Sequence, residues 1–248
     1  MKNGSMVTRT DAAIYLSEQR GCTQLESSKS LHTFNFRNYF DESKKAFGTL
    51  QVINDDTLRP GAGMKMQVKY NAEVIIIPVI GGLEYKNDLV LEGFVEAGEI
   101  LVFSAVKGME YEIINPYENE LINFIQIWLR NDQPVFVPDM QSIRIDLSRK
   151  NNLLPVFSGT GNGISIQQDT SGWIGKYIGR EEGQYVVRNP ENGIFIFVIS
   201  GVFEVEDRLL HAKDGLALKN TDAVEFEALS NDAIIMVMEI GNSGFSND

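Results

Sequence analysis

The chain has 248 residues, of which 43% are hydrophobic and 23% are charged, values that are ordinary for globular proteins with a buried core. Acidic residues outnumber basic ones by 34 to 22, and the net charge of -12 would repel a phosphate backbone, so we expect no direct nucleic-acid binding. The single cysteine cannot form an intramolecular disulfide, and no apolar run approaches the roughly 20 residues that span a bilayer, which favours a cytoplasmic protein without membrane contact.

Short apolar and β-branched runs recur along the chain, separated by Gly, Asn, Asp and Pro, a spacing typical of an all-β sandwich or barrel. Turn signals such as Pro60-Gly61 and Asn192-Gly193 separate these runs. Helical periodicity is scarce, so we predict an all-β fold. The clearest predicted strands, in chain order, cover residues 49–54, 73–79, 100–104, 122–129, 194–200 and 233–240.

A pattern in residues 82–112 returns in residues 201–227. In both copies, a strand that begins with glycine is followed by a glycine turn, an apolar strand and a strand with alternating glutamates. The last of these strands reads Met-Glu-Tyr-Glu at 109–112 and Val-Glu-Phe-Glu at 224–227. Because an internal repeat indicates a duplicated unit, we predict two small jelly-roll barrels.

The segment 31–41 reads Leu-His-Thr-Phe-Asn-Phe-Arg-Asn-Tyr-Phe-Asp and resembles the opening signature of the pirin-like proteins, also called pirin and quercetinase-like bicupins. The resemblance extends over roughly residues 20 to 240. It continues in the family's order through 52–56 (Val-Ile-Asn-Asp-Asp), Pro60-Gly61, Asn115-Pro116, 126–129 (Gln-Ile-Trp-Leu), Gly201 and 214–217 (Asp-Gly-Leu-Ala).

This resemblance implies a bicupin, in which each half forms a double-stranded β-helix, or jelly-roll, barrel. Residues 1–130 are assigned to an N-terminal pirin-like cupin and residues 153–248 to a C-terminal cupin. Residues 131–152, rich in Asn, Asp, Gln and Pro, are predicted to connect the two.

Members of this family hold a metal, usually iron, in the first cupin on a His-x-His pair and a His-x-Glu pair. Residues two apart on a strand point to one face, so two such pairs can direct four donors into one barrel. Carried onto this chain, the pairs fall on Gln67 with Lys69 and on Tyr111 with Ile113. These side chains include a cation, an aliphatic group and two weak ligands. The resemblance therefore points to a metal-free branch, similar to the redox-sensitive bicupins, with no cofactor.

Two interpretations of these positions stay open. In the first, they line a small-molecule pocket in the first cupin, where Lys69 attracts an anionic group that Tyr111 and Gln67 orient. In the second, the side chains form a hydrogen-bonded plug in place of the metal, and Glu73 pairs with Lys69.

The histidines and the cysteine offer little else for chemistry. His32 has apolar neighbours and is predicted to be a packed structural residue, whereas His211 is predicted to lie in an exposed loop. Cys22 lies in a polar segment and is predicted to be exposed and inert, with redox sensing as the alternative.

We therefore expect a non-enzymatic small-molecule-binding or regulatory protein, with no protein partner identified. The alternative is an enzyme. It would be similar to quercetin 2,3-dioxygenase with a metal recruited by another route, or it would be a cofactor-independent catalyst in which Lys69 and Tyr111 exchange protons.

Overall fold

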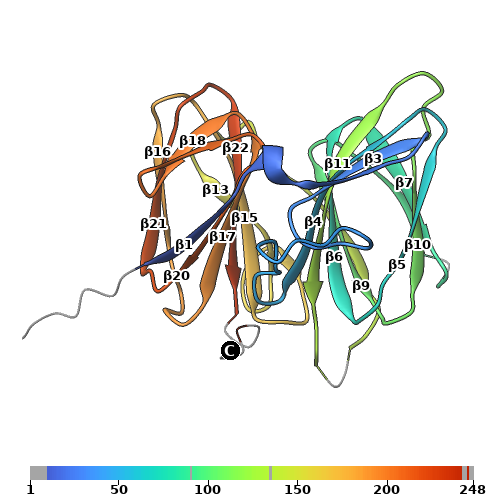
Figure 1. Cartoon of the computed structure of the whole chain (residues 1–248), viewed down its shortest axis with the longest axis horizontal. Coiled ribbons are helices and arrows are strands. Elements are labelled where there is room, and N and C mark those ends of the chain that lie inside the picture. Colours follow the sequence, from blue (N-terminus) through green and yellow to red (C-terminus); the bar gives the residue numbers. More distant parts are fainter. Residues whose placement is uncertain (1–9, 90, 134–135, 242–244, 246–248) are drawn as a thin grey trace, which may run out of the picture.

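The computed structural model describes residues 10–89, 91–133, 136–241 and 245, and Figure 1 shows two β-barrels lying side by side. Each barrel combines a seven-stranded sheet with a four-stranded sheet. The only helix among the described residues is a short 3-10 turn, η1 (Ser17–Gln19). The prediction of an all-β bicupin is confirmed, and each of the six predicted strands is present.

The first barrel is built mainly from the N-terminal half. Its seven-stranded sheet has the order β12 (Met140–Arg144), β9 (Glu99–Ala105), β6 (Ala72–Ile80), β11 (Ile122–Arg130), β4 (Leu50–Leu58), β3 (Ser28–His32) and β2 (Gly21–Gln24). Its four-stranded sheet has the order β5 (Gly63–Gln67), β10 (Glu110–Ile114), β7 (Gly82–Asn87) and β8 (Glu92–Glu96).

The second barrel repeats this order. Its seven-stranded sheet runs β1 (Asp11–Tyr15), β20 (Gly215–Lys219), β17 (Gly193–Ser200), β22 (Ala233–Ile240), β15 (Thr170–Tyr177), β13 (Leu153–Ser158) and β14 (Ile164–Ser165). Its four-stranded sheet runs β16 (Glu182–Val186), β21 (Ala223–Ala228), β18 (Val202–Val205) and β19 (Arg208–His211). The matching orders explain the internal repeat in the sequence.

Two strands depart from the predicted division of the chain. β1 was assigned to the first barrel, within residues 1–130, but it pairs with β20 at the edge of the second. β12 lies in the segment predicted as the connection, yet it pairs with β9 at the edge of the first barrel. Residues 1–9 and 134–135 lie outside the described part of the chain.

The central strands of the seven-stranded sheets are buried on both faces because these sheets pack against each other between the barrels. One face of β6 points Val74 and Ile76 into the first barrel, whereas Ile75 and Ile77 face the second barrel. Because both faces of these strands are buried, their sequences are continuous apolar runs and do not alternate between apolar and polar residues. The four-stranded sheets have an exposed outer face and alternate, as in β5.

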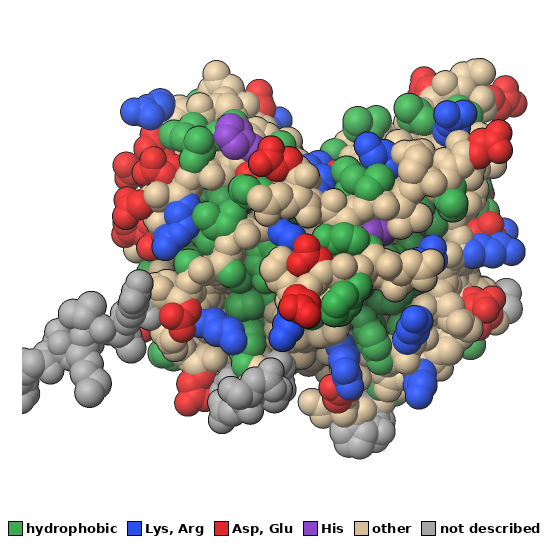
Figure 2. Space-filling model, in the orientation of Figure 1, with side chains coloured by type: hydrophobic (Ala, Val, Ile, Leu, Met, Phe, Trp, Pro, Cys, Tyr) green, Lys and Arg blue, Asp and Glu red, His purple; other side chains and the backbone are tan. Residues whose placement is uncertain are grey.

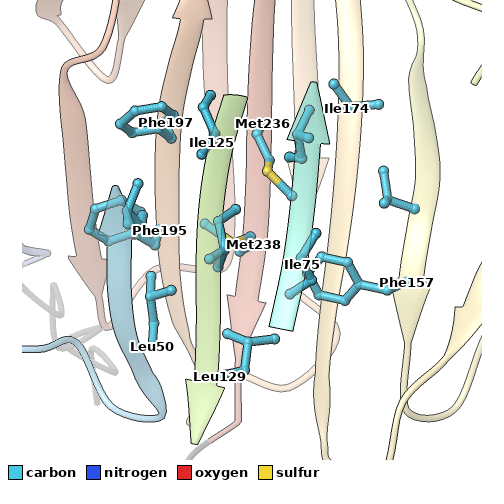
Figure 3. Packing of buried hydrophobic residues seen from close by; sticks show 14 of the residues in the cluster. Leu50, Ile75, Ile125, Leu129, Phe157, Ile174, Phe195, Phe197, Met236 and Met238 are labelled. Carbon is cyan, nitrogen blue, oxygen red and sulfur yellow. The ribbon is translucent and has the colours of Figure 1, made fainter. Parts of the chain in front are cut away.

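Figure 3 shows the core between the barrels, where Leu50, Ile125 and Leu129 of the first barrel face Phe195 and Met238 of the second. All five side chains are completely buried. This shared apolar layer fixes one barrel against the other. Among the described residues, the structure contains no helix that is long and apolar enough to cross a membrane.

Candidate functional site

A chain of hydrogen bonds between polar side chains fills the interior of the first barrel. The Tyr111 hydroxyl donates to Gln126 Oε1 at 2.7 Å and accepts from Trp128 Nε1 at 3.0 Å. Gln126 Nε2 in turn donates to Asp56 Oδ2. Tyr111, Gln126 and Asp56 are all at most 2% exposed. This arrangement is a hydrogen-bonded plug of the kind that one interpretation of the sequence predicted, although only Tyr111 among its members was named there.

Two of the four predicted pocket positions do not face this interior. Tyr111 and Ile113 point into the barrel, but Gln67 and Lys69 are exposed on its outside. The inward positions of the facing strand belong to Met64 and Met66, which pair with Ile113 and Tyr111. Because side chains alternate along a strand, a register one residue away from the expected one reverses every side chain. The prediction that Gln67 and Lys69 point inward is therefore wrong.

Glu73 also lies elsewhere than predicted. Its side chain is 1% exposed and faces the second barrel, where Oε1 accepts from the Gln167 backbone N–H at 2.8 Å. Oε2 accepts from the Ser104 hydroxyl at 2.7 Å. Burial raises the pKa of Glu73, whereas these hydrogen bonds lower it. Glu73 is thus a link between the barrels and not the partner of Lys69.

A groove of about 580 Å³ opens at the surface of the first barrel, above this plug. Its described lining residues include three cations and no carboxylate, although the whole chain carries a net charge of -12. Figure 2 shows several Lys and Arg side chains on the visible face of this barrel. The charged and aromatic residues of the groove are Arg37, Lys45, Lys69, Phe36, Tyr70 and Trp128.

The groove has an aromatic floor. Phe36 meets Trp128 edge-on with ring centroids 5.7 Å apart, and Tyr70 meets it at 6.4 Å. Trp128 connects the groove to the plug through its bond to Tyr111. Lys69 thus belongs to a pocket, as one interpretation expected, but to a surface groove and not to the barrel interior. This arrangement suits a flat molecule that carries negative charge.

Arg37 is a groove residue that the sequence reasoning did not single out. Its guanidinium lies 5.5 Å from the centroid of the Phe36 ring and donates to the Lys65 carbonyl at 3.0 Å. Its φ of 52° is uncommon for a residue other than glycine, so packing must hold this conformation. The signal was present, since Arg37 lies within the signature at 31–41.

Comparison with known proteins identifies the family of both barrels. Residues 15–129 match the family described as Pirin, and residues 156–240 match the quercetinase C-terminal cupin domain. The chain belongs to the pirin and quercetinase bicupin family.

Several members of the pirin family are similar to this chain over most of its length. The quercetin 2,3-dioxygenase of Escherichia coli K12 is 25% identical over 225 residues, which cover 90% of this chain and 97% of that protein. A pirin-like protein of Caulobacter vibrioides is 25% identical over 213 residues, covering 84% and 91%. The structure of YhhW from E. coli has a TM-score of 0.85 at 22% identity and covers 95% of this chain and all of YhhW.

YhhW has also been solved in complex with nickel(II), with a TM-score of 0.83 at 22% identity over 93% of this chain and 99% of YhhW. The inward positions of this pirin-family chain do not suit such an ion. Met64 and Met66 offer thioethers, Tyr111 a neutral phenol and Ile113 no donor, whereas nickel and iron favour imidazole and carboxylate. The described residues contain no group of three or more His, Cys, Asp and Glu side chains able to hold a metal.

Asp56 gives this pirin-family plug a dependence on pH. Burial raises the pKa of Asp56 from 3.8 to about 6, despite hydrogen bonds from Ser30 and Gln126 that lower it. The folded protein therefore holds a proton that the unfolded chain has lost between these pH values. We expect the stabilisation that Asp56 contributes to fall by about 2 kcal/mol as pH rises from 4 to 6, out of about 3 kcal/mol over the whole titration, since each pKa unit corresponds to about 1.4 kcal/mol.

Urea unfolding at several pH values measures this loss. In Asp56→Asn, the amide oxygen can still accept from Gln126 and no ionisation occurs, so the loss over this pH range should shrink. The exposed Asp88→Asn serves as the control and should leave the loss unchanged. If stability depends on pH in Asp56→Asn as it does in the parent protein, then groups other than Asp56 cause that dependence.

The remaining predictions concern three residues outside the groove and the plug. His32 is 1% exposed and bonds to Asn54 Oδ1 and Thr23 Oγ1, both at 2.9 Å, which confirms a structural histidine. Burial lowers its pKa, so its neutral form is favoured. His211 is exposed as predicted, but it ends strand β19 and does not lie in a loop. Cys22 is a free, exposed thiol, as predicted.

Proposed function

We propose that this pirin-family protein uses the groove of its first barrel to bind a small, flat organic anion without a metal. The observation that carries the proposal is the cluster of Arg37, Lys45 and Lys69 over an aromatic floor, with no carboxylate among the described lining residues. A volume of about 580 Å³ lies within the range of about 300–1,000 Å³ that small-molecule sites occupy. A cytoplasmic location and a binding or regulatory role, rather than catalysis, complete the proposal.

The groove also suits its ligand electrostatically. Because the cations are exposed, each can reach a carboxylate or phenolate without a large desolvation cost, while the rings cover the apolar part of the ligand. Burial raises the pKa of Tyr70 to about 12, so its phenol stays neutral and can donate a hydrogen bond.

Binding can be followed through Trp128, since the chain has two tryptophans and the other can be removed by Trp173→Phe. We expect quercetin and simple aromatic carboxylates to quench its fluorescence at saturation. Lys69→Met and Arg37→Met should each weaken binding roughly tenfold, because a hydrogen bond to a charged group contributes about 1.5–3 kcal/mol.

Lys86→Met is the matched control, because Lys86 is an exposed cation of the same barrel that does not line the groove. The groove would be refuted as a binding site if Lys69→Met and Arg37→Met bound these compounds as tightly as Lys86→Met. The absence of quenching by every compound would refute it as well.

The rival function is the activity named in the relatives, a quercetin 2,3-dioxygenase. Its support is the 25% identity with the E. coli enzyme, and the donor set of Met64, Met66, Tyr111 and Ile113 argues against it. We expect no consumption of quercetin under oxygen after addition of iron, nickel or manganese. Turnover that requires one of these ions would favour the enzyme. Turnover without metal that is lost in Lys69→Met would favour the cofactor-independent alternative.

A further inference from the structure

Figure 1 shows η1 at one end of the molecule, where the chain crosses from one barrel to the other. Two basic side chains meet the same carboxylate near this turn. Arg20 directly follows η1, and Lys213 lies in the turn between β19 and β20 of the second barrel. Figure 2 shows that the molecular surface is hollowed into a notch between the barrels at this end. The cluster is separate from the groove of the first barrel, with which it shares no lining residue.

One carboxylate serves both cations. Arg20 Nη2 lies 3.3 Å from Asp55 Oδ2, and Lys213 Nζ lies 3.6 Å from Asp55 Oδ1. Asp55 Oδ1 also accepts a hydrogen bond from Asn123 Nδ2 at 2.7 Å. The next carboxylate, Asp214, directs its two oxygens at the backbone N–H groups of Ser17 and His211, and no ion pair joins it to either cation among the described residues. The ion-paired groups of the cluster are therefore two cations and one carboxylate.

Two nitrogen atoms of this cluster have no hydrogen-bond acceptor. Arg20 Nη1 and Lys213 Nζ are both buried without a hydrogen bond, although Lys213 has its ion pair with Asp55, and the side chains are only 5% and 17% exposed. Leaving charged donors without hydrogen bonds in a buried place is costly, because the hydrogen bonds that each made to water are not replaced. A partner for these donors must be an acceptor, and the excess of positive charge favours a negative one.

We propose that a small inorganic anion, of the size and charge of chloride, binds between Arg20 Nη1 and Lys213 Nζ. The anion would complete the coordination of both donors and balance the second cation. It would also join the two barrels, since Lys213 belongs to the second barrel and Arg20 directly precedes β2 of the first. Burial lowers the pKa of Lys213, and a bound anion would oppose this effect as Asp55 does.

The first test is thermal unfolding of the full chain in increasing chloride, with the ionic strength held constant by gluconate, which is too large to enter. At about 100 times its Kd, a bound anion multiplies the folding equilibrium constant about a hundredfold and should raise the unfolding midpoint by roughly 5 to 10 °C. A midpoint that does not respond to chloride overturns the proposal.

Variants separate this site from general screening by salt. Lys213→Met removes one donor and should abolish the chloride response, whereas Lys86→Met, an exposed cation of the first barrel, should retain it. Asp55→Asn removes the competing carboxylate and keeps an acceptor for Asn123, so it should bind chloride more tightly than the parent. Equal responses in all of these proteins would assign the effect to screening and contradict the proposal.

A crystal of the parent protein grown in bromide provides a test that does not depend on any variant. We expect an anomalous peak within about 3.5 Å of Arg20 Nη1 and Lys213 Nζ, the distance expected for a contact with a large halide. Density for water alone at this position, without an anomalous signal, would overturn the proposal.

Discussion

A nickel site is expected to form in the first barrel when Met64→His, Met66→His, Tyr111→His and Ile113→Glu are combined. Met66 pairs with Tyr111 and Met64 with Ile113 across β5 and β10, and all four side chains point inward. The combination would therefore direct three imidazoles and one carboxylate into one cavity, a donor set suited to iron or nickel.

The matched control moves the first pair by three residues, to positions that face outward. A second variant with Gln67→His, Lys69→His, Tyr111→His and Ile113→Glu carries the same four new side chains, but two of them lie outside the barrel. Isothermal titration with nickel should find one ion per chain in the first variant and only weak binding in the second. The first variant should still bind nickel roughly 10- to 100-fold more weakly than a native site does. It lacks the groups that would hydrogen-bond to the ligating side chains and orient them.

Circular dichroism checks that both variants fold. Tighter nickel binding by the variant at positions 67 and 69 would show that these residues converge in solution and that the register seen in β5 does not hold. Nickel binding without quercetin cleavage is the expected result for the first variant, since the four substitutions supply metal ligands and no substrate contacts.

The largest loss of stability is expected from Phe195→Ala. Phe195 is completely buried in the core between the barrels, with ring centroids 5.5 Å from Phe34, 5.6 Å from Tyr15 and 5.9 Å from Phe47. Removing a buried phenylalanine costs about 3–5 kcal/mol. Because Phe34 and Phe47 belong to the first barrel, both barrels should lose stability together, in a single calorimetric transition.

Phe40→Ala is the control, since Phe40 is 75% exposed and its removal should change stability by no more than about 0.5 kcal/mol. Two separate transitions in Phe195→Ala, one of them unchanged from the parent, would show that the barrels unfold independently and that the shared core does not couple them.

Much of the fold could be predicted from the sequence because burial on both faces produces long apolar runs. Residues 194–200 and 233–240 are examples, and the structure places β17 and β22 there within one residue. The partner of β1 could not be predicted, since Asp11–Tyr15 carries no apolar pattern that distinguishes one sheet edge from another. Pairing across about 200 residues is set by the assembled barrels and not by local sequence.

The candidate site was predicted in part. Tyr111 and Ile113 were placed correctly, because β10 follows the expected alternation. Gln67 and Lys69 were not, because the family's motif and not the local pattern was used to place them. The alternation of Met64, Met66 and Val68 with polar neighbours marks the inward positions. Asp56 and Gln126 were part of quoted signatures, but a sequence does not show that two strands turn them toward each other.

The position of β1 bears on how the protein is made. This strand precedes every other described strand in the chain, and its partner β20 leaves the ribosome about 200 residues later. At about 5 to 20 residues per second, roughly 10 to 40 s of synthesis separate the two. During this time β1 has no sheet to join, and the second barrel cannot cover its β20 edge until β1 returns to it. The strand β1 is therefore translated before its whole barrel and is among the last to find its native place.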